Sequence, residues 1–119
     1  MPTRPLLLLV EDDRATSRAL RGIFDRRGWD VLHAATVAEA LSHLSAAPKC
    51  VILDLMLPDG DGLTVLEKIR SEDLPIRVAV TSGSNDLARL RAVSALRPEV
   101  FLPKPISLPD LLAGLEVGP

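Results

Sequence analysis

The chain has 119 residues and a mass of 12.8 kDa, a length that predicts one domain with one hydrophobic core. It carries 14 basic and 16 acidic residues, and the net charge of −2 excludes the basic surface that is typical of nucleic-acid-binding proteins. The single cysteine, Cys50, excludes a disulfide scaffold and a multi-cysteine metal site, and it is typical of a protein of the reducing cytoplasm.

Five apolar runs have the length of β-strands. In chain order they are Leu6–Val10, Val31–Ala34, Cys50–Leu53, Val78–Val80 and Val100–Leu102. Most of them are continuous rather than alternating, which indicates strands buried on both faces, as in a parallel sheet covered by helices. Val31–Ala34 is more mixed and predicts an edge strand. Leu6–Val10 is far too short to cross a bilayer, so no membrane segment is predicted.

The segments between these runs carry apolar residues at the spacing of amphipathic helices. In chain order the stripes are Leu20, Ile23 and Phe24; Val37, Ala40, Leu41 and Leu44; Leu63, Leu66 and Ile69; Leu87, Leu90 and Val93; and Leu108, Leu111, Leu112 and Leu115. Thr36 and Ser107 are predicted to cap the second and fifth helices, and Ser84 or Asn85 the fourth. The five-fold alternation of strand and helix predicts a doubly wound α/β fold with a single parallel sheet.

Polar residues follow the predicted strands directly. They are Glu11, Asp12 and Asp13 after the first strand, Asp54 after the third, Thr81 and Ser82 after the fourth, and Lys104 after the fifth. In an open parallel sheet the carboxyl ends of the strands form the ligand-binding edge, so we expect these side chains to converge there. Glu11, Asp12 and Asp13 alone would fit a solvated turn or a helix N-cap.

The chemistry of this set favours a phosphoryl site. Carboxylates held close together repel each other, so a divalent cation or a raised pKa is expected. Oxygen ligands without histidine or cysteine favour a hard ion such as Mg²⁺. A lysine and a hydroxyl at the same edge suit phosphoryl oxygens, and an aspartate beside the ion can act as a nucleophile. The residues therefore predict a Mg²⁺-dependent phosphoryl site around Asp54, Thr81 or Ser82, and Lys104.

Four segments contain these polar residues: Val10-Glu11-Asp12-Asp13, Leu53-Asp54-Leu55-Met56-Leu57-Pro58-Asp59-Gly60, Val80-Thr81-Ser82-Gly83 and Leu102-Pro103-Lys104-Pro105. Together they resemble the signature of receiver domains of two-component response regulators. The similarity covers the whole chain, so that residues 1–119 would be one receiver domain with a core over about residues 5–116. It implies a flavodoxin-like sheet of strand order 2-1-3-4-5 with five helices. It also implies an aspartate that accepts a phosphoryl group from a histidine kinase or a histidine phosphotransfer protein.

The resemblance also implies a role for each matching residue of the acidic edge. Asp54 would be the phosphoryl acceptor and a ligand of Mg²⁺. Asp12 would bind the ion directly, Glu11 mainly through a water molecule, and Met56 with its backbone carbonyl. The domain would assist only its own phosphorylation and dephosphorylation, and it would otherwise not be an enzyme.

Switching would involve residues of the last two strands. By the same resemblance, Lys104 would pair with a phosphoryl oxygen, with a cis peptide bond to Pro105. Thr81 rather than Ser82 would turn its hydroxyl to the phosphoryl group, and Phe101 would move inward with it. The face formed by the fourth helix, fifth strand and fifth helix would then contact a downstream effector domain or protein. Direct binding of nucleic acid is not expected, and a homodimer stays open.

The sequence disfavours three alternative functions. A Mg²⁺-dependent phosphatase with an aspartyl nucleophile would need an acid where this chain has Met56, and a nucleotide-binding protein would need a glycine-rich loop after the first strand. A degenerate receiver that signals without phosphorylation is disfavoured by the intact motifs. Several residues are expected to be structural only: Asp59 and Asp61 in turns, His33 and His43 far from the acidic edge, Cys50 and Trp29 in packing, and Arg14, Arg18 and Arg21 on a solvated helix face.

Overall fold

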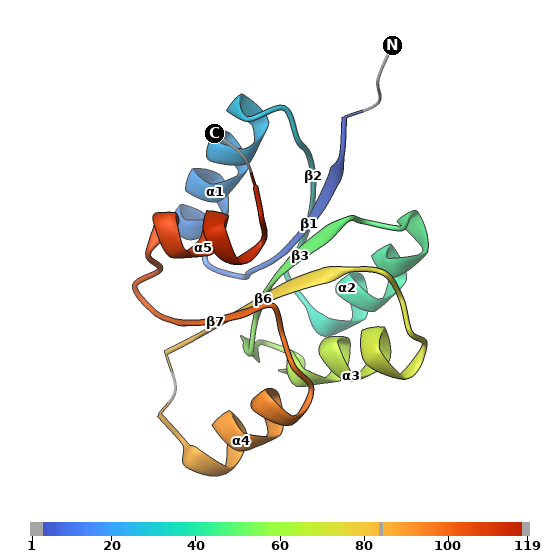
Figure 1. Cartoon of the computed structure of the whole chain (residues 1–119), viewed down its shortest axis with the longest axis vertical. Helices are drawn as coiled ribbons and strands as arrows, with labels where there is room; N and C mark the ends of the chain where they lie inside the picture. Colours follow the sequence, from blue (N-terminus) through green and yellow to red (C-terminus); the bar gives the residue numbers. More distant parts are fainter. Residues whose placement is uncertain (1–3, 84, 118–119) are drawn as a thin grey trace.

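Within residues 4–83 and 85–117, which the computed structural model describes, five parallel strands form one sheet (Figure 1). They are β1 (Leu6–Val10), β2 (Asp30–Ala34), β3 (Cys50–Asp54), β6 (Arg77–Ser82) and β7 (Val100–Pro103). Their order is β2-β1-β3-β6-β7, which is the predicted order 2-1-3-4-5 when these five strands are counted along the chain. Two further strands, β4 (Met56–Leu57) and β5 (Gly60–Asp61), form a small antiparallel hairpin directly after β3.

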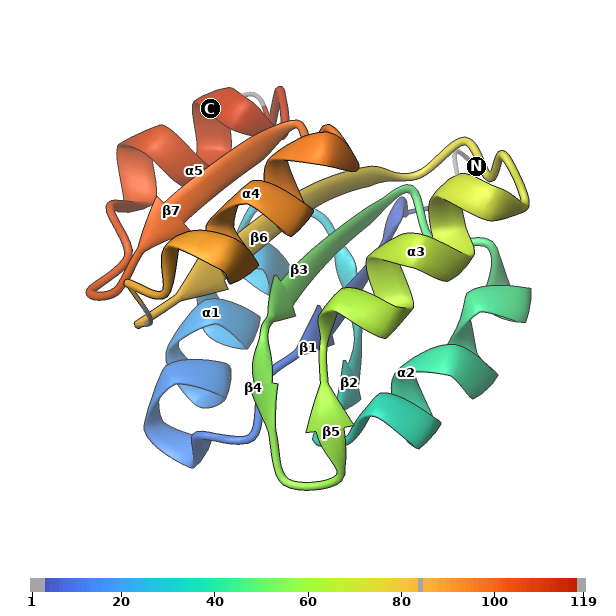
Figure 2. The ribbon, with the colours of Figure 1, turned by 90° about the horizontal axis from the view of Figure 1, so that it is seen from below.

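The described part of the chain also contains five α-helices and one short 3₁₀ helix, η1 (Leu44–Ala46). The α-helices are α1 (Arg14–Arg26), α2 (Val37–His43), α3 (Leu63–Ser71), α4 (Leu87–Ala95) and α5 (Leu108–Gly114). Helices α1 and α5 cover one face of the sheet, and α2, α3 and α4 cover the other (Figures 1 and 2). The predicted doubly wound fold is confirmed.

The helix caps agree with the sequence at two of three places. Thr36 accepts a hydrogen bond from the backbone N–H of Glu39 at 3.1 Å, and Ser107 caps α5 in the same way. The prediction for α4 was wrong at Asn85, because Asp86 caps that helix and accepts from the N–H groups of Ala88 and Arg89. Ser84, the other predicted cap, lies outside the described residues.

The central strands explain the continuous apolar runs. Successive side chains of a strand point to opposite faces. Leu7 and Leu9 of β1 are buried against α1 and α5, and Leu8 and Val10 against the helices of the other face. Each fully buried side chain of this size contributes about 1.5–3 kcal/mol of transfer free energy, so both faces of β1 anchor the fold. No helix in the described ranges is both long and apolar enough to span a bilayer.

Asp59, in the turn between β4 and β5, also joins this hairpin to α2. Its two carboxylate oxygens accept hydrogen bonds from the backbone N–H groups of Val37 at 2.7 Å and Ala38 at 3.1 Å. These bonds hold the pKa of Asp59 below its ordinary value of 3.8. Asp59 therefore lies in the predicted turn, and it also accepts hydrogen bonds from otherwise unpaired N–H groups in the first turn of α2, 22 residues away.

We expect Asp59→Asn to lower the Tm at pH 7, because a neutral amide accepts these two bonds less well than a carboxylate. A lowered pKa in the folded state stabilises the fold above the unfolded pKa of 3.8, and this contribution is lost as the pH falls through the lower folded value. The Tm difference between wild type and variant should therefore shrink below pH 3.8 in thermal unfolding series. A difference that stays constant from neutral to acidic pH would contradict this assignment.

Candidate functional site

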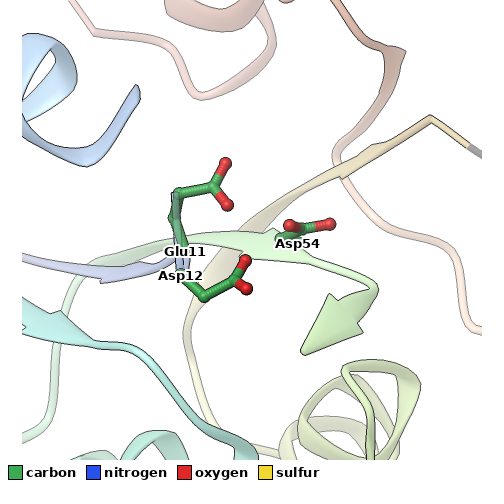
Figure 3. Close-up of side chains that lie close together, drawn as sticks. All are labelled: Glu11, Asp12 and Asp54. Carbon is green, nitrogen blue, oxygen red and sulfur yellow. The ribbon is translucent and has the colours of Figure 1, made fainter. Parts of the chain in front are cut away.

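Three acidic side chains meet at the carboxyl edge of the sheet. Glu11 and Asp12 follow β1, and Asp54 ends the neighbouring strand β3, whose Leu53 pairs with Val10. One carboxylate oxygen of each lies within 4.8 Å of the others, and the three groups point into the same region (Figure 3). Glu11 and Asp54 are buried, whereas Asp12 is exposed. The predicted convergence is present, and oxygen atoms alone form this potential cation site.

Lys104 supplies positive charge to this cluster from the far end of the chain. Its Nζ donates to Glu11 Oε1 at 2.9 Å and to Asp54 Oδ2 at 3.0 Å. The backbone N–H of Lys104 donates to the Ser82 carbonyl at 3.0 Å, which fixes the start of the side chain beside β6. The Lys104–Pro105 peptide bond is cis, as predicted. One ammonium group thus offsets two buried carboxylates.

The electrostatics of the cluster follow from burial and close contact. Burial raises the pKa of Glu11 above its ordinary value of 4.5, and the neighbouring Asp54 raises it further, while the Lys104 bond opposes both effects. Burial alone would lower the pKa of Lys104, but its hydrogen bonds to the two carboxylates outweigh this and raise it. Lys104 therefore stays protonated at neutral pH and serves as a fixed cation.

Residues around Asp54 orient it. The backbone N–H of Met56 donates to Asp54 Oδ1 at 3.1 Å, so that both carboxylate oxygens of Asp54 are held. Thr81 pairs with Asp54 across β3 and β6 and is almost completely buried. Phe101 on β7 is half-buried and packs against the core on the α2–α4 face. The structure thus places Asp54 and Thr81 side by side at the edge of the sheet, whereas Phe101 lies further inside, opposite Val80.

The model of the response regulator receiver domain family matches residues 7–116. The chain belongs to the response regulator receiver domain family. It is 39% identical over 116 residues to the response regulator MprA of Mycolicibacterium vanbaalenii, covering 95% of this chain and 48% of that protein. The chain thus spans about half the length of the curated relatives it matches.

Solved structures agree with this assignment. A response regulator receiver protein from Pseudomonas putida is 30% identical with a TM-score of 0.85, and the match covers 98% of both chains. The Mn²⁺-bound form of response regulator Rcp1 is 27% identical with a TM-score of 0.77, covering 94% of this chain and 89% of that one. The chain is therefore a signalling domain with the flavodoxin-like fold that its sequence predicts.

Asp13, the third acid after β1, has a different role in this receiver domain. Its carboxylate caps α1 by accepting from the backbone N–H of Thr16 at 2.9 Å and from the Thr16 hydroxyl at 2.6 Å. These bonds hold the pKa of Asp13 below its ordinary value. Of the three consecutive acids, Glu11 and Asp12 therefore join Asp54, and Asp13 positions the helix that follows.

The prediction that His33 lies far from the acidic edge was wrong. His33 pairs with Leu9 across β2 and β1, and its Nε2 lies 2.7 Å from the backbone carbonyl oxygen of Glu11. The predicted strand order could have indicated this contact. It places β2 beside β1, and a side chain near the end of β2 reaches the loop after β1. His33 thus supports the backbone of the receiver domain's acidic cluster from the sheet edge.

Two further residues, Gly62 and Arg89, contact the segment after Asp54 (residues 55–62), and Arg89 was not singled out from the sequence. A Cβ at Gly62 would lie 2.2 Å from the Asp54 carbonyl oxygen, so only glycine fits there. Arg89 of α4 donates from Nη2 to the Leu55 carbonyl at 2.8 Å and forms an ion pair with Asp61 at the same distance. Asp61, expected only in a turn, therefore also binds α4, the helix that connects β6 to β7.

Proposed function

We propose that this receiver domain accepts a phosphoryl group on Asp54 from the phosphohistidine of a histidine kinase or a histidine phosphotransfer protein. The observation that carries the proposal is the bridge of Lys104 between Glu11 and Asp54 beside exposed Asp12. In this arrangement Asp54 is a buried nucleophile, Lys104 is a nearby cation, and Asp12 is an acid that solvent can reach. Such a site supports phosphoryl transfer, which depends on positioning and charge neutralisation.

The acidic cluster fits Mg²⁺. Asp12 and Asp54 would be direct ligands with the Met56 carbonyl, and Glu11 would act mainly through water. The all-oxygen donor set supports a hard divalent ion, and the related Rcp1 structure contains Mn²⁺. When bound, the ion would offset the negative charge of the carboxylates and of the incoming phosphoryl oxygens.

The chain's own residues orient the reaction. A carboxylate oxygen of Asp54 attacks phosphorus, the P–N bond to the donor histidine breaks, and the imidazole takes the bonding electron pair as it leaves. The Met56 N–H holds one Asp54 oxygen in place during this approach. The Lys104 ammonium can then pair with a phosphoryl oxygen while it keeps its bond to Glu11. Thr81 lies beside Asp54 to offer its hydroxyl to the same group.

A groove next to Lys104 supports an encounter with the phosphodonor. It lies between α1 and the loop that joins β7 to α5, and its volume is about 720 Å³. Ala19, Ile23 and Ile106 make its lining largely apolar, and Lys104 borders it. A helix of a histidine kinase or histidine phosphotransfer protein that docks here would bring its histidine close to Asp54. The effector contact would lie on the face of α4, β7 and α5.

Incubation with acetyl phosphate and Mg²⁺, followed by intact-mass measurement, tests the proposal. We expect one added phosphoryl group on wild type, none on Asp54→Asn, and one on Asp59→Asn, a matched control whose acid lies outside the cluster. Omission of Mg²⁺ should greatly slow the labelling. Equal labelling of Asp54→Asn and wild type, or no labelling of wild type, would overturn the proposal.

A further inference from the structure

Helix α4 is weakly anchored by apolar packing. Val93 is the only buried residue of this helix, all of which the structure describes. Leu87, in its first turn, keeps 67% of its surface exposed. By contrast, α3 buries Val65, Leu66 and Ile69. Because little apolar area holds α4 to the sheet, polar contacts have a larger share in fixing its position.

Arg89 provides such a contact between α4 and the segment that follows Asp54. Its Nη2 donates to the Leu55 carbonyl and pairs with Asp61 Oδ1, each at 2.8 Å. The side chain is only 24% exposed, so water screens this ion pair less than a fully solvated one. The bond to Leu55 spans 34 residues of sequence. Figure 2 shows the parts that it joins, with α4 on the same face as β4 and β5.

The acceptors of Arg89 are themselves fixed points of the site. The Leu55 carbonyl also accepts from the N–H of Gly62 at 2.8 Å, and Asp61 Oδ1 also accepts from the N–H of Leu63 at 2.9 Å. Leu55 directly follows Asp54 in the chain. A shift of the backbone after Asp54 would therefore change the Arg89 contacts at once, while the two backbone donors would keep the hairpin and α3 together.

The guanidinium of Arg89 is not fully satisfied in this arrangement. Its Nε is buried and donates to no acceptor among the residues that the structure describes. A buried donor without a partner costs free energy. The Nη2 contacts therefore hold the side chain in a position where the Nε–H group stays without an acceptor. A guanidinium in this state can exchange its partners at a small cost when the neighbouring backbone or charge changes.

We propose that Arg89 acts as a latch that holds α4 to the acceptor segment, residues 55–62, in the unphosphorylated domain. Through this contact Arg89 also transmits the phosphorylation state of Asp54 to α4. The transmission rests on the proposed function, and the latch does not. Arg89 is a positioning residue, since it reaches Asp54 only through Leu55. If phosphorylation of Asp54 changes the affinity of α4 for a partner by some factor, thermodynamic linkage requires that binding of this partner change the phosphorylation equilibrium of Asp54 by the same factor.

Amide hydrogen exchange tests the latch in the full chain, with Arg89→Met as the variant and Arg91→Met, an exposed arginine of the same helix, as the control. In the unphosphorylated protein we expect exchange over residues 87–95 to rise about tenfold in Arg89→Met and to stay unchanged in Arg91→Met. The Tm of both variants should stay close to that of wild type. Equal α4 exchange in Arg89→Met and wild type would overturn the latch.

The coupling is tested by repeating the exchange measurement after phosphorylation with acetyl phosphate and Mg²⁺. Wild type and Arg91→Met should show a change in α4 exchange on phosphorylation, and Arg89→Met should lose most of it while Asp54 is still labelled. An unchanged response in Arg89→Met would overturn the coupling. Failure of Asp54 labelling in wild type would instead overturn the proposed function, and the measurement on the unphosphorylated protein would still decide the latch.

Discussion

Replacement of Lys104 by methionine is expected to lower the free energy of unfolding by about 2 kcal/mol when no divalent cation is present. The change removes the ammonium that bridges Glu11 and Asp54 and leaves two buried carboxylates facing each other. Removal of one partner of a fully buried ion pair usually costs more, but Lys104 is 30% exposed, and water reduces the effect. Urea unfolding at pH 7 in the presence of a chelator measures this difference.

Two controls separate this charge effect from lost packing. Lys49→Met, at an exposed lysine, should leave the free energy of unfolding within about 0.5 kcal/mol of wild type. Addition of Asp54→Asn to Lys104→Met should recover part of the loss, because only one buried carboxylate then remains without its cation. A double variant as unstable as the sum of both single changes would contradict the electrostatic explanation.

Gly62→Ala is expected to destabilise the domain by about 3 kcal/mol and to disturb the acceptor segment. The new Cβ would lie 2.2 Å from the Asp54 carbonyl oxygen and 3.0 Å from the Leu55 Cα. Both contacts are with backbone, which cannot turn aside as a flexible side chain can. The β4–β5 hairpin would have to move away from the end of β3, and Arg89 would lose its alignment with Leu55.

Gly83→Ala is the matched control for this substitution. Apart from its neighbours in the chain, no described residue has an atom within 4 Å of a Cβ built at Gly83, which also lies close to the acceptor edge. Denaturant unfolding and intact-mass labelling of both variants should therefore show a large loss for Gly62→Ala and almost none for Gly83→Ala. Equal stability of the two variants would show that the backbone after Asp54 has more freedom than the close contact indicates.

The sequence predicted the order of the elements and the place of the site for a physical reason. The spacing of apolar residues along the chain distinguishes strands buried on both faces from amphipathic helices. Parallel strands then bring their carboxyl ends to one edge of the sheet. Glu11, Asp54 and Lys104 each follow such a strand, so their meeting at one edge could be predicted. Strand ends were less well predicted, because β3 and β6 continue into the polar residues Asp54 and Thr81, whose side chains carry no apolar signal.

Long-range polar contacts could not be predicted in the same way. The reach of Arg89 to Leu55 depends on the rotation of α4 about its axis, and its stripe of Leu87, Leu90 and Val93 gave little information on that rotation. The contact of His33 with Glu11 depends on the position of one ring nitrogen near the end of an edge strand. Period fixes which face of an element is buried, but it does not fix which carbonyl a long side chain finds.

The span of the Lys104 bonds has a consequence for how the domain reaches its native state. Lys104 lies 93 residues after Glu11 and 50 residues after Asp54, so the two acids leave the ribosome long before their cation. A partly folded chain that lacked β7 would hold both carboxylates together without their counter-charge, at a cost of about 2 kcal/mol, as expected for Lys104→Met. This penalty disfavours intermediates without the last strand, so assembly of the acidic cluster and completion of the sheet become one cooperative event.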